Sequence, residues 1–509
     1  MNTKQLKAKV LDLAIHGKLL SPETVAELKK SPDYETADVL LEKIRKEKEE
    51  KIAKGELKRD KKDSYIFVGD DKRHYEKFAD GTVKDIEDEI PFDVPEGWAW
   101  ARIASLVSIN LGLTHTPKYV EKGIPFYSVK DISNGYLDES EPKYVSQEEF
   151  NTFLEGAKPR KGDIIFCRVG TIGKPHIVSV DYPFGIFVSV GFFRKYSERI
   201  NSKYIMDWMN SPFFYEQVDY NVKGGVIKNL NTGWLSEFLI PIPSEKEQQE
   251  IAFRIDEIFS KIALLEENKT ELQKTVTYAK AKILDLAIHG KLVPQDTNDE
   301  PASVLLEKLR AEKEEKIAKG ELKRDKNDSF IYKGSDNCYY EKFADGTEEQ
   351  VEPPAIVPES WVWCHFGDVA DVINGKNQSK VEDESGIYPI YGSGGIMGRA
   401  NDYICPENCT IIGRKGSINN PIFVEEKFWN VDTAFGLAPS TGVLPKYLFY
   451  FCKSFNFTSL DSSTTLPSLT KTNIQQILFP LPSLSEQQRI LNKVESLFKK
   501  LDEIVLNLI

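Results

Sequence analysis

The sequence has little cysteine and no long hydrophobic run. Its six cysteines are scattered through 509 residues, which indicates a reducing compartment rather than a disulfide framework. Cys405 and Cys409 lie close together but have no second pair at zinc-ligand spacing, so we expect no metal site. No apolar stretch approaches the ~20 residues of a membrane-spanning helix, and the first residues lack the apolar core of a signal peptide. We therefore expect a cytoplasmic protein with no membrane contact.

Catalytic motifs are missing as well. There is no GxxxxGK[ST] phosphate loop, and the glycine-rich run that begins at Tyr391 places Met397 where a dinucleotide-binding motif needs its third glycine. The Asn-Pro-Pro-aromatic motif of amino-methyltransferases does not occur, and the six histidines are spread singly. Without a nucleophile, a base and a group to orient the base, we expect a chain that is not an enzyme and holds no cofactor.

The charge balance does not favour one partner. Lysine and arginine number 67 against 79 aspartates and glutamates, which gives a formal net charge of −12. An acidic chain argues mildly against nucleic acid, whose binding proteins usually carry a basic face. Net charge decides little, however, because a local group of cations or a partner subunit can supply the field.

The most strongly patterned stretch is a long helix predicted over Ser244–Gly290. Ser244 and Glu247 have the spacing of a capping box, and Gly290 is a suitable residue just beyond the C-terminus. Between these ends, apolar residues recur in alternating steps of four and three, the repeat of a coiled coil. A second helix from Ser483 repeats the cap and the steps. The residues predicted to form the interface between the helices are Ile251, Ile255, Ile258, Ile262, Leu265, Ile490, Val494, Leu497, Leu501 and Ile504.

Both ends of the chain match this central helix. Residues 483–509 correspond to its first half, 239 positions earlier, and the AKVLDLAIHGKLL segment from Ala8 corresponds to its second half, 273 positions later. Ile509 thus corresponds to Thr270 and Met1 to Lys274, so the two ends together rebuild the helix with three positions missing. This predicts a tandem repeat in a pseudo-two-fold circular arrangement, with the termini close together.

The remaining segments also repeat, but unequally. Residues 40–82 and 305–347 are identical at 33 of 43 positions, and each copy leads to a Pro-Trp signature, PEGWAW at Pro95 or PESWVW at Pro358. The globular segments that follow differ in length and in most residues. The expected boundaries are residues 1–20 for a half-helix, 21–97 for a charged helical and hairpin connector, 98–243 for the first globular domain, 244–293 for the central helix, 294–360 for the second connector, 361–482 for the second globular domain and 483–509 for the C-terminal helix.

A constant frame around two dissimilar domains favours a scaffold that presents two recognition surfaces. Polar and basic residues near glycine-bearing turns suit base edges of DNA, since Arg and Lys pair with guanine and Asn and Gln with adenine. Each of these residues could also be an ordinary polar residue on the protein surface with no role in binding. Arg168 and Arg414 stand out because the two domains place them in the same turn. The candidates for DNA binding are Thr114, His115, Lys118, Tyr127, Ser128, Lys130, Arg168, Thr171, Lys174, Lys223 and Lys228 in the first domain, and Asn374, Lys376, Gln378, Tyr391, Ser393, Arg399, Arg414, Lys415, Ser417, Asn419, Asn420 and Lys471 in the second.

The repeated motifs resemble those of the specificity subunits of type I restriction-modification systems. The resemblance covers the whole chain and includes PIPSEKEQQEIAFRID, PLPSLSEQQRILNKVE, AKILDLAIHGKL, YEKFADG, PEGWAW and GDIIFCRVGTIGKP. It implies an α+β fold with two globular α/β target-recognition domains separated by two long antiparallel coiled-coil helices. Each domain would read one half of a bipartite sequence in double-stranded DNA.

The resemblance also implies partners for the chain. Two methyltransferase subunits would dock on the helices and bind S-adenosylmethionine, and motor-nuclease subunits would join them. This chain would direct their activities without a catalytic role. The alternative function is a non-catalytic coiled-coil scaffold that presents two protein-binding domains.

Overall fold

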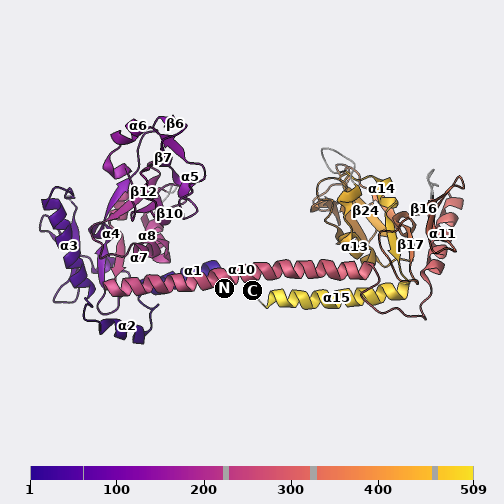
Figure 1. The fold of residues 1–509 in the computed structure, drawn as a ribbon, viewed down its shortest axis with the longest axis horizontal. Helices are drawn as coiled ribbons and strands as arrows, with labels where there is room; N and C mark the ends of the chain where they lie inside the picture. The colour runs from indigo at the N-terminus through magenta and orange to yellow at the C-terminus, as the bar shows by residue number, and fades with distance from the viewer. Residues whose placement is uncertain (1, 61, 222–228, 321–328, 461–467, 508–509) are drawn as a thin grey trace. The chain divides into compact units, whose positions relative to one another are not determined.

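The computed structural model describes residues 2–60, 62–221, 229–320, 329–460 and 468–507. The chain divides into two compact units, which we call unit 1 (Met1–Glu267) and unit 2 (Asn268–Ile509). Each unit mixes helices with small sheets around its own apolar cores (Figure 1), which confirms the predicted mixed α and β content. None of the helices in these described ranges has the length and apolar character to cross a membrane.

The described residues of unit 1 form four small sheets, with strand orders β1-β2-β3, β4-β13, β10-β9-β12-β5 and β11-β7-β8-β6. Its helices are α1 (Thr3–Ile15), α2 (Pro22–Lys29), α3 (Ala37–Ala53), α4 (Ile103–Leu106), α5 (Val129–Ile132), α6 (Gln147–Thr152), α7 (Ser202–Asn210), α8 (Pro212–Asn221), α9 (Thr232–Ser236) and most of α10 (Glu245–Ile288). Its strands are β1 (Ser64–Val68), β2 (His74–Phe78), β3 (Val83–Asp85), β4 (Ala99–Arg102), β5 (Val107–Leu111), β6 (Tyr119–Val120), β7 (Ile124–Tyr127), β8 (Lys143–Val145), β9 (Ile164–Cys167), β10 (Gly173–Ile177), β11 (Gly185–Ile186), β12 (Val190–Lys195) and β13 (Leu239–Ile242).

Unit 2 repeats this plan, with strand orders β14-β15-β16, β17-β25, β18-β24-β21-β22 and β20-β19-β23. Its helices, after the end of α10, are α11 (Ala302–Ala318), α12 (Phe366–Val369), α13 (Pro445–Ser454), α14 (Lys471–Gln475) and α15 (Leu484–Leu506). Its strands are β14 (Ser329–Lys333), β15 (Tyr339–Phe343), β16 (Glu348–Val351), β17 (Val362–His365), β18 (Ala370–Asn374), β19 (Tyr388–Gly392), β20 (Gly395–Ala400), β21 (Cys409–Gly413), β22 (Ile422–Val424), β23 (Trp429–Asn430), β24 (Ala434–Pro439) and β25 (Leu478–Leu481).

The start of α10 is held by a joint that combines three of the repeated motifs. Ser244 Oγ accepts a hydrogen bond from Glu247 N at 3.2 Å, and Glu247 Oε2 accepts one from Ser244 N at 3.1 Å, so the predicted capping box forms. The other carboxylate oxygen, Glu247 Oε1, accepts a bond from Trp98 Nε1 at 3.2 Å. Gly17, which follows α1 with a φ of +65°, has no room for a side chain because Pro95 packs against it. The helix end, the Pro-Trp signature and the helix start thus form one buried contact.

Unit 2 builds the same joint with one change. Trp361 Nε1 donates to Glu486 Oε2 at 2.9 Å, and Ser483 Oγ accepts from Glu486 N at 3.1 Å. The other oxygen of Glu486 accepts a bond from Gln295 instead of closing a capping box, so the sequence prediction holds here only for the serine cap. Gly290 again packs against the adjacent proline ring, that of Pro358.

The glutamine after each joint glutamate fixes the globular domain to the long helix. Gln248 accepts a hydrogen bond from Asn201 N at 2.9 Å and donates to Pro243 O at 3.1 Å. Its counterpart Gln487 accepts from Leu444 N at 2.8 Å and donates to Pro482 O at 3.2 Å. Both side chains are fully buried, and in each the amide oxygen accepts and the amide nitrogen donates a hydrogen bond. Rotation of the domain about the helix would therefore leave buried polar groups unpaired.

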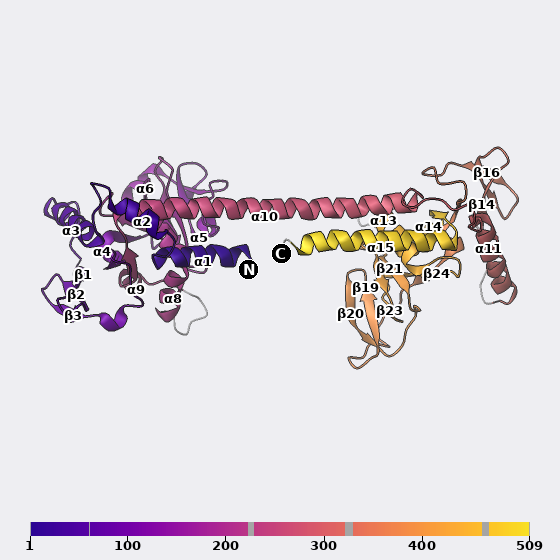
Figure 2. The same cartoon turned by 90° about the horizontal axis from the view of Figure 1, so that it is seen from below.

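Each unit contains an antiparallel pair of helices (Figure 2). In unit 1, α1 lies along α10, with Lys7 Nζ 3.3 Å from Glu266 and Ile15 in the same core as Ile251. In unit 2, α15 lies along the end of α10, with Lys280 Nζ 2.6 Å from Asp502 and Val494 in the same core as Leu284. Among the predicted interface residues, five are buried and three half-buried. The buried ones are Ile251, Ile255, Ile262, Ile490 and Val494, and the half-buried ones are Ile258, Leu497 and Leu501.

The interface prediction is wrong for two residues. Leu265 is 61% exposed and Ile504 is 45% exposed. Each lies two heptads after a buried residue, Ile251 or Ile490. Both lie near the end of a helix pair, where fewer neighbouring side chains cover them. Leu265 adjoins Glu266, whose partner Lys7 is near the start of α1, and Ile504 is in the last turn of α15.

The packed seam predicts a large loss of stability on insertion of a charge. Ile255→Asp would bury an unpaired carboxylate between α10 and α1. This should lower the free energy of unfolding by about 3–5 kcal/mol. The exposed Ser260 lies on the same helix, and Ser260→Asp serves as the control with little expected effect. Urea unfolding of both variants measures the difference. An Ile255→Asp midpoint equal to that of the wild type would contradict the packing described.

Candidate nucleic-acid interface

In unit 1, four chain segments meet at one edge of the two larger sheets. The backbone after β5 bonds to the end of β11, with Leu113 N donating to Ile186 O at 2.8 Å. The link between β11 and β12 bonds to the end of β7, where Phe187 N donates to Tyr127 O at 2.9 Å. The turn after β9 joins the same link, as Arg168 N donates to Ser189 O at 2.9 Å. The loops at this edge, which we call the loop edge, are therefore fixed by backbone hydrogen bonds.

Unit 2 forms a loop edge of the same construction. After β18, Lys376 N donates to Asn430 O at 2.9 Å, and after β23, Val431 N donates to Tyr391 O at 3.0 Å. The turn after β21 is held where Arg414 N donates to Thr433 O at 2.8 Å. The two units thus share a backbone arrangement at this edge although their side chains there differ.

Two glycines that the sequence analysis missed make this arrangement possible. A Cβ atom on Gly112 would collide with the carbonyl oxygen of Phe187, and one on Gly375 would collide with that of Val431. The signal was present, because each glycine directly follows the first strand of its larger sheet in both domains. A glycine at this position permits the close approach of two backbones.

Eleven of the predicted side chains lie on these loops or at the strand ends beside them and are exposed or half-exposed. In unit 1 they are Thr114, His115, Ser128, Thr171 and Lys174, and in unit 2 they are Asn374, Lys376, Ser393, Arg414, Lys415 and Ser417. Lys174 has a φ of +52°, which presents its side chain from the tight turn between β9 and β10. Lysine, arginine, asparagine and hydroxyl groups on fixed loops are the donors that bind phosphates and base edges.

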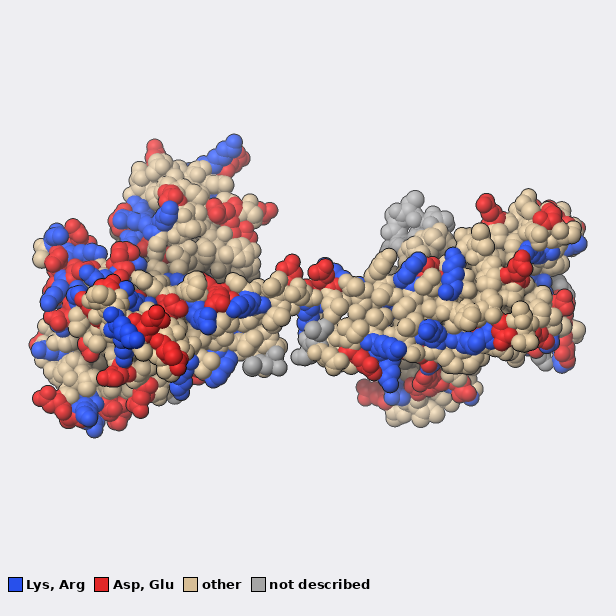
Figure 3. All heavy atoms as spheres, turned by 60° about the horizontal axis from the view of Figure 1, so that its bottom comes forward, with Lys and Arg blue, Asp and Glu red and all other residues tan. Residues whose placement is uncertain are grey.

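Charges of both signs are mixed on the surface of the protein. On the face that Figure 3 shows, Lys and Arg are interspersed with Asp and Glu over both units. Lys130 illustrates this, since its Nζ lies 3.6 Å from the carboxylate of the adjacent Asp131. Any attraction for phosphate must therefore come from a few cations rather than from a broad basic surface. The residues described in the structure include no cluster of three or more potential metal ligands.

Comparison with known proteins identifies the family. The model of the type I restriction modification DNA specificity domain matches residues 95–274 and 358–508, which include both loop edges and the tryptophan and glutamate of each joint. The chain belongs to the type I restriction-modification DNA specificity family. Most of each connector, including α3, α11 and the sheets β1–β3 and β14–β16, lies outside the matched segments.

Curated relatives and solved structures agree with this assignment. The chain is 24% identical to the EcoAI specificity subunit of Escherichia coli over 98% of this chain and 90% of that one. It is 25% identical to the EcoEI specificity subunit of Escherichia coli over 72% of this chain and 61% of that one. The crystal structure of the HsdS subunit from Thermoanaerobacter tengcongensis matches with a TM-score of 0.50 at 16% identity and covers 82% of this chain and 92% of that one. This last likeness concerns the fold alone.

Two predicted DNA-binding residues of this specificity subunit are used by the fold instead. Arg168 is only 9% exposed and donates from Nε to Leu230 O at 3.1 Å and from Nη1 to Val188 O at 2.8 Å. Burial lowers the pKa of its guanidinium. The Tyr127 ring is buried and its hydroxyl shares a 3.1 Å hydrogen bond with that of Tyr182. The predictions for Arg168 and Tyr127 are therefore corrected, because both side chains already have internal partners.

Other predicted residues lie away from the exposed surface of the loop edge. Asn419 accepts from Phe457 N at 2.8 Å and donates to Asn456 Oδ1 at 2.7 Å, so its amide fastens a neighbouring loop. Arg399 lies at the far end of the β19–β20 hairpin, and Lys118 precedes the edge strand β6. Tyr391 is half-buried, with its ring against Phe428.

Five predicted DNA-binding residues remain. Gln378 is half-buried in the loop after β18, and Asn420 is exposed after the β21 turn. Lys471 begins α14, two residues after Leu469, whose N–H donates to Arg414 O at 3.0 Å. Lys223 and Lys228 lie outside the described residues.

Substitution of the two matched arginines should affect stability to different extents. Arg168→Ala would leave two buried carbonyl groups without donors and should cost ~1–3 kcal/mol of unfolding free energy. Arg414→Ala removes an exposed side chain whose Cζ lies 5.8 Å from the centroid of the Phe435 ring. The expected change in unfolding free energy is therefore within about 0.5 kcal/mol. Thermal melting of the two variants measures the contrast. Equal losses in both would contradict the different roles described here.

Proposed function

We propose that this specificity subunit recognises a bipartite target in double-stranded DNA, with one half read by the loop edge of each unit. The single observation that carries the proposal is the shared backbone of the two loop edges combined with their different side chains. A common frame would bring each edge to a DNA groove in the same way, and the differing side chains would select different bases.

We further propose that the specificity subunit directs methyltransferase and motor-nuclease subunits and has no catalytic centre of its own. The methyltransferase subunits would bind S-adenosylmethionine, and their cations could close around the DNA and offset the acidic net charge of −12. On this proposal the two antiparallel helix pairs belong to one pseudo-two-fold frame, which the matching chain ends complete.

Exposed apolar side chains on α10 support the docking of a partner. Phe253 is 65% exposed and Leu264 is 56% exposed, although both lie on a helix with a packed seam. Phe253 is two residues from the buried Ile255, and Leu264 is two residues from the buried Ile262. At about 100° per residue, each exposed side chain therefore points about 200° around the helix axis from its buried neighbour. Tyr278 has the same relation to Val276 in unit 2. On this proposal these exposed side chains are available for contact with a docked methyltransferase subunit.

Exchange of one domain tests the division of the target. Residues 98–243 would be replaced by the equivalent segment of a related specificity subunit, with Ser244, Glu247 and Gln248 kept in place. We expect one half of the methylated sequence to change while the other half and the unread gap remain fixed. Methylome sequencing in cells that also express the methyltransferase subunits measures this. If both halves change, or if neither the parent nor the exchange protein binds DNA, the proposal fails.

A matched pair of arginine variants tests the role of the loop edge in unit 2. Arg414→Ala removes a cation from the loop edge and should weaken binding to the target duplex by about 1–3 kcal/mol. Arg399→Ala removes an exposed arginine at the far end of the β19–β20 hairpin and serves as the control. Titration of both variants with the same duplex at one salt concentration gives the comparison. A larger loss for Arg399→Ala would place the interface elsewhere.

A further inference from the structure

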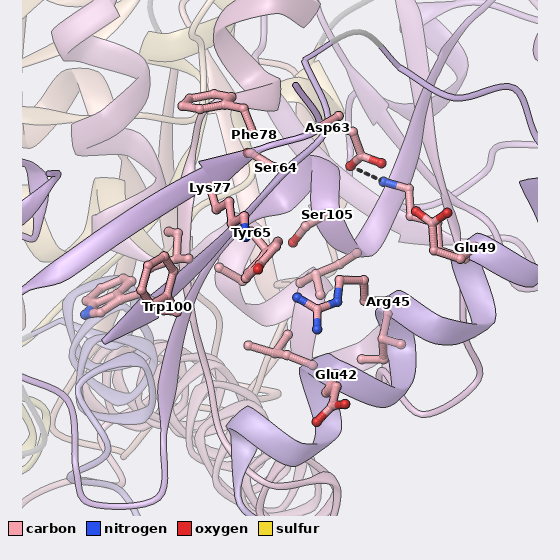
Figure 4. A pocket seen from close by; sticks show the side chains of 18 of the residues that line it. Glu42, Arg45, Glu49, Asp63, Ser64, Tyr65, Lys77, Phe78, Trp100 and Ser105 are labelled. Carbon is pink, nitrogen blue, oxygen red and sulfur yellow. Dashed lines mark hydrogen bonds and ion pairs between the residues drawn. The ribbon is translucent and has the colours of Figure 1, made fainter. Parts of the chain in front are cut away.

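The connector of unit 1 encloses a cavity of about 390 Å³, which we call the connector pocket (Figure 4). It lies between helix α3, strands β1 and β2, and the β4–α4 segment. Ile44, Phe78 and Trp100 contribute apolar walls, and Arg45 points toward Tyr65 and Ser105. This volume is at the small end of the ~300–1,000 Å³ range of small-molecule sites. The connector pocket lies outside the part of the chain that the family model matches, apart from the β4–α4 wall.

The second connector is a nearly identical copy and shows what the pocket cations bind when a carboxylate is present. Arg45 and Lys77 correspond to Arg310 and Lys342, 265 positions later. In unit 2, Arg310 Nη2 lies 3.5 Å from Asp368 Oδ2, and Lys342 Nζ lies 2.9 Å from Glu348 Oε1. Both cations of that copy therefore have a carboxylate partner within the chain.

Unit 1 lacks both of these carboxylates. Ser105 in α4 stands where α12 carries Asp368, and Val83 pairs across the strands with Lys77 just as Glu348 pairs with Lys342. Neither Arg45 nor Lys77 makes a hydrogen bond or ion pair with another residue in the described part of the chain. Arg45 only lies over the Tyr65 ring, with its Cζ 4.1 Å from the ring centroid.

The other charged groups of the connector pocket contact one another, although Glu42 and Glu49 also attract Arg45 through space. Lys48 Nζ is 2.6 Å from Asp63, Arg59 Nη1 is 2.8 Å from Glu49, and Glu42 is 2.7 Å from Lys46 outside the pocket. Asp38 lies two helical turns from Arg45 along α3, and burial raises the pKa of its carboxyl group. Among the cations that line the pocket, Arg45 and Lys77 are thus the two without a direct carboxylate contact in the described residues.

We propose that the connector pocket binds a small planar molecule that carries a carboxylate or a phosphate. Its anionic group takes the place beside Arg45 that the Asp368 carboxylate occupies beside Arg310. The planar guanidinium forms paired hydrogen bonds with either kind of anion, and the rings of Tyr65 and Phe78 with Ile44 accommodate the body of the ligand. This proposal concerns a site apart from the loop edges and does not depend on how DNA is recognised.

The test uses the full chain and three defined probes. Benzoate and phenyl phosphate carry the required anion on a planar body, and benzamide has the same body without charge. We expect calorimetry to show one site for each anion and at least about tenfold weaker binding of benzamide, because hydrogen bonds to charged groups are the stronger ones. Absence of binding by both anions, or benzamide binding as tight as benzoate binding, would overturn the proposal.

Reciprocal substitutions use the internal repeat as the control. Ser105→Asp should supply the missing carboxylate to Arg45, raise the melting temperature and weaken binding of both anions about tenfold or more. The double variant Asp368→Ser with Glu348→Val should leave Arg310 and Lys342 without these carboxylate partners and raise the number of bound anions from one to two. Circular dichroism confirms that each variant is folded.

The two variants also distinguish this pocket from other sites. If Ser105→Asp is folded and binds the anions with unchanged affinity, they bind elsewhere and the proposal is wrong. If Ser105→Asp is unfolded, Arg45→Met replaces it, and the same loss of binding is expected. Unchanged affinity in Arg45→Met would likewise overturn the proposal.

Discussion

The structure depends on a buried hydrogen bond from a tryptophan indole to the glutamate that begins each long helix. Trp98 bonds to Glu247 in unit 1 and Trp361 bonds to Glu486 in unit 2. The glutamate is held within the first turn of the helix, and in unit 1 it also closes the capping box. The tryptophan begins the globular domain, so one contact fixes where the domain joins the helix. Loss of either partner would leave a buried polar group unpaired, which explains why both copies need the same pair.

This joint separates the constant part of the molecule from the variable part. The adjacent glutamine, Gln248 or Gln487, binds the domain through both ends of a buried amide. The loop edges depend on backbone hydrogen bonds and on the close approach at Gly112 and Gly375, none of which requires a particular side chain at the surface. The exposed residues of the loops can therefore change without disturbing the frame. That property suits a subunit whose role is specificity.

Local chemistry allowed much of the frame to be predicted from the sequence. The cap at Ser244, the apolar repeat of α10 and the duplicated motifs each act over a few residues, and the structure has α10 over Glu245–Ile288. The three motifs that meet at the joint could be recognised separately, but their contact could not, because Gly17 and Pro95 are far apart in the sequence. The exposed Leu265 shows a second limit, since the apolar repeat alone does not indicate where the α1–α10 pair ends.

The binding residues were harder to predict than the frame. Arg168 and Arg414 occupy the same turn, yet one guanidinium is buried on two carbonyl groups and the other is exposed. The backbone around the two arginines is alike, so the difference lies in the side chains: Arg168 donates to Leu230 O and Val188 O, whereas the Arg414 guanidinium lies over the Phe435 ring. The unpaired cations of the connector pocket also became apparent only in three dimensions, because Ser105 and Val83 are distant in sequence from Arg45.

The central claim is that α10 acts as a spacer between two independent recognition surfaces. The most direct measurement is the methylated sequence of a variant with four residues inserted after Glu267, expressed with its methyltransferase subunits. The insertion adds about one helical turn and ~6 Å, close to two base pairs at ~3.4 Å each. The account predicts that both half-sites keep their bases while the gap between them lengthens. A variant that methylates different bases in either half-site, with the gap unchanged, would contradict it.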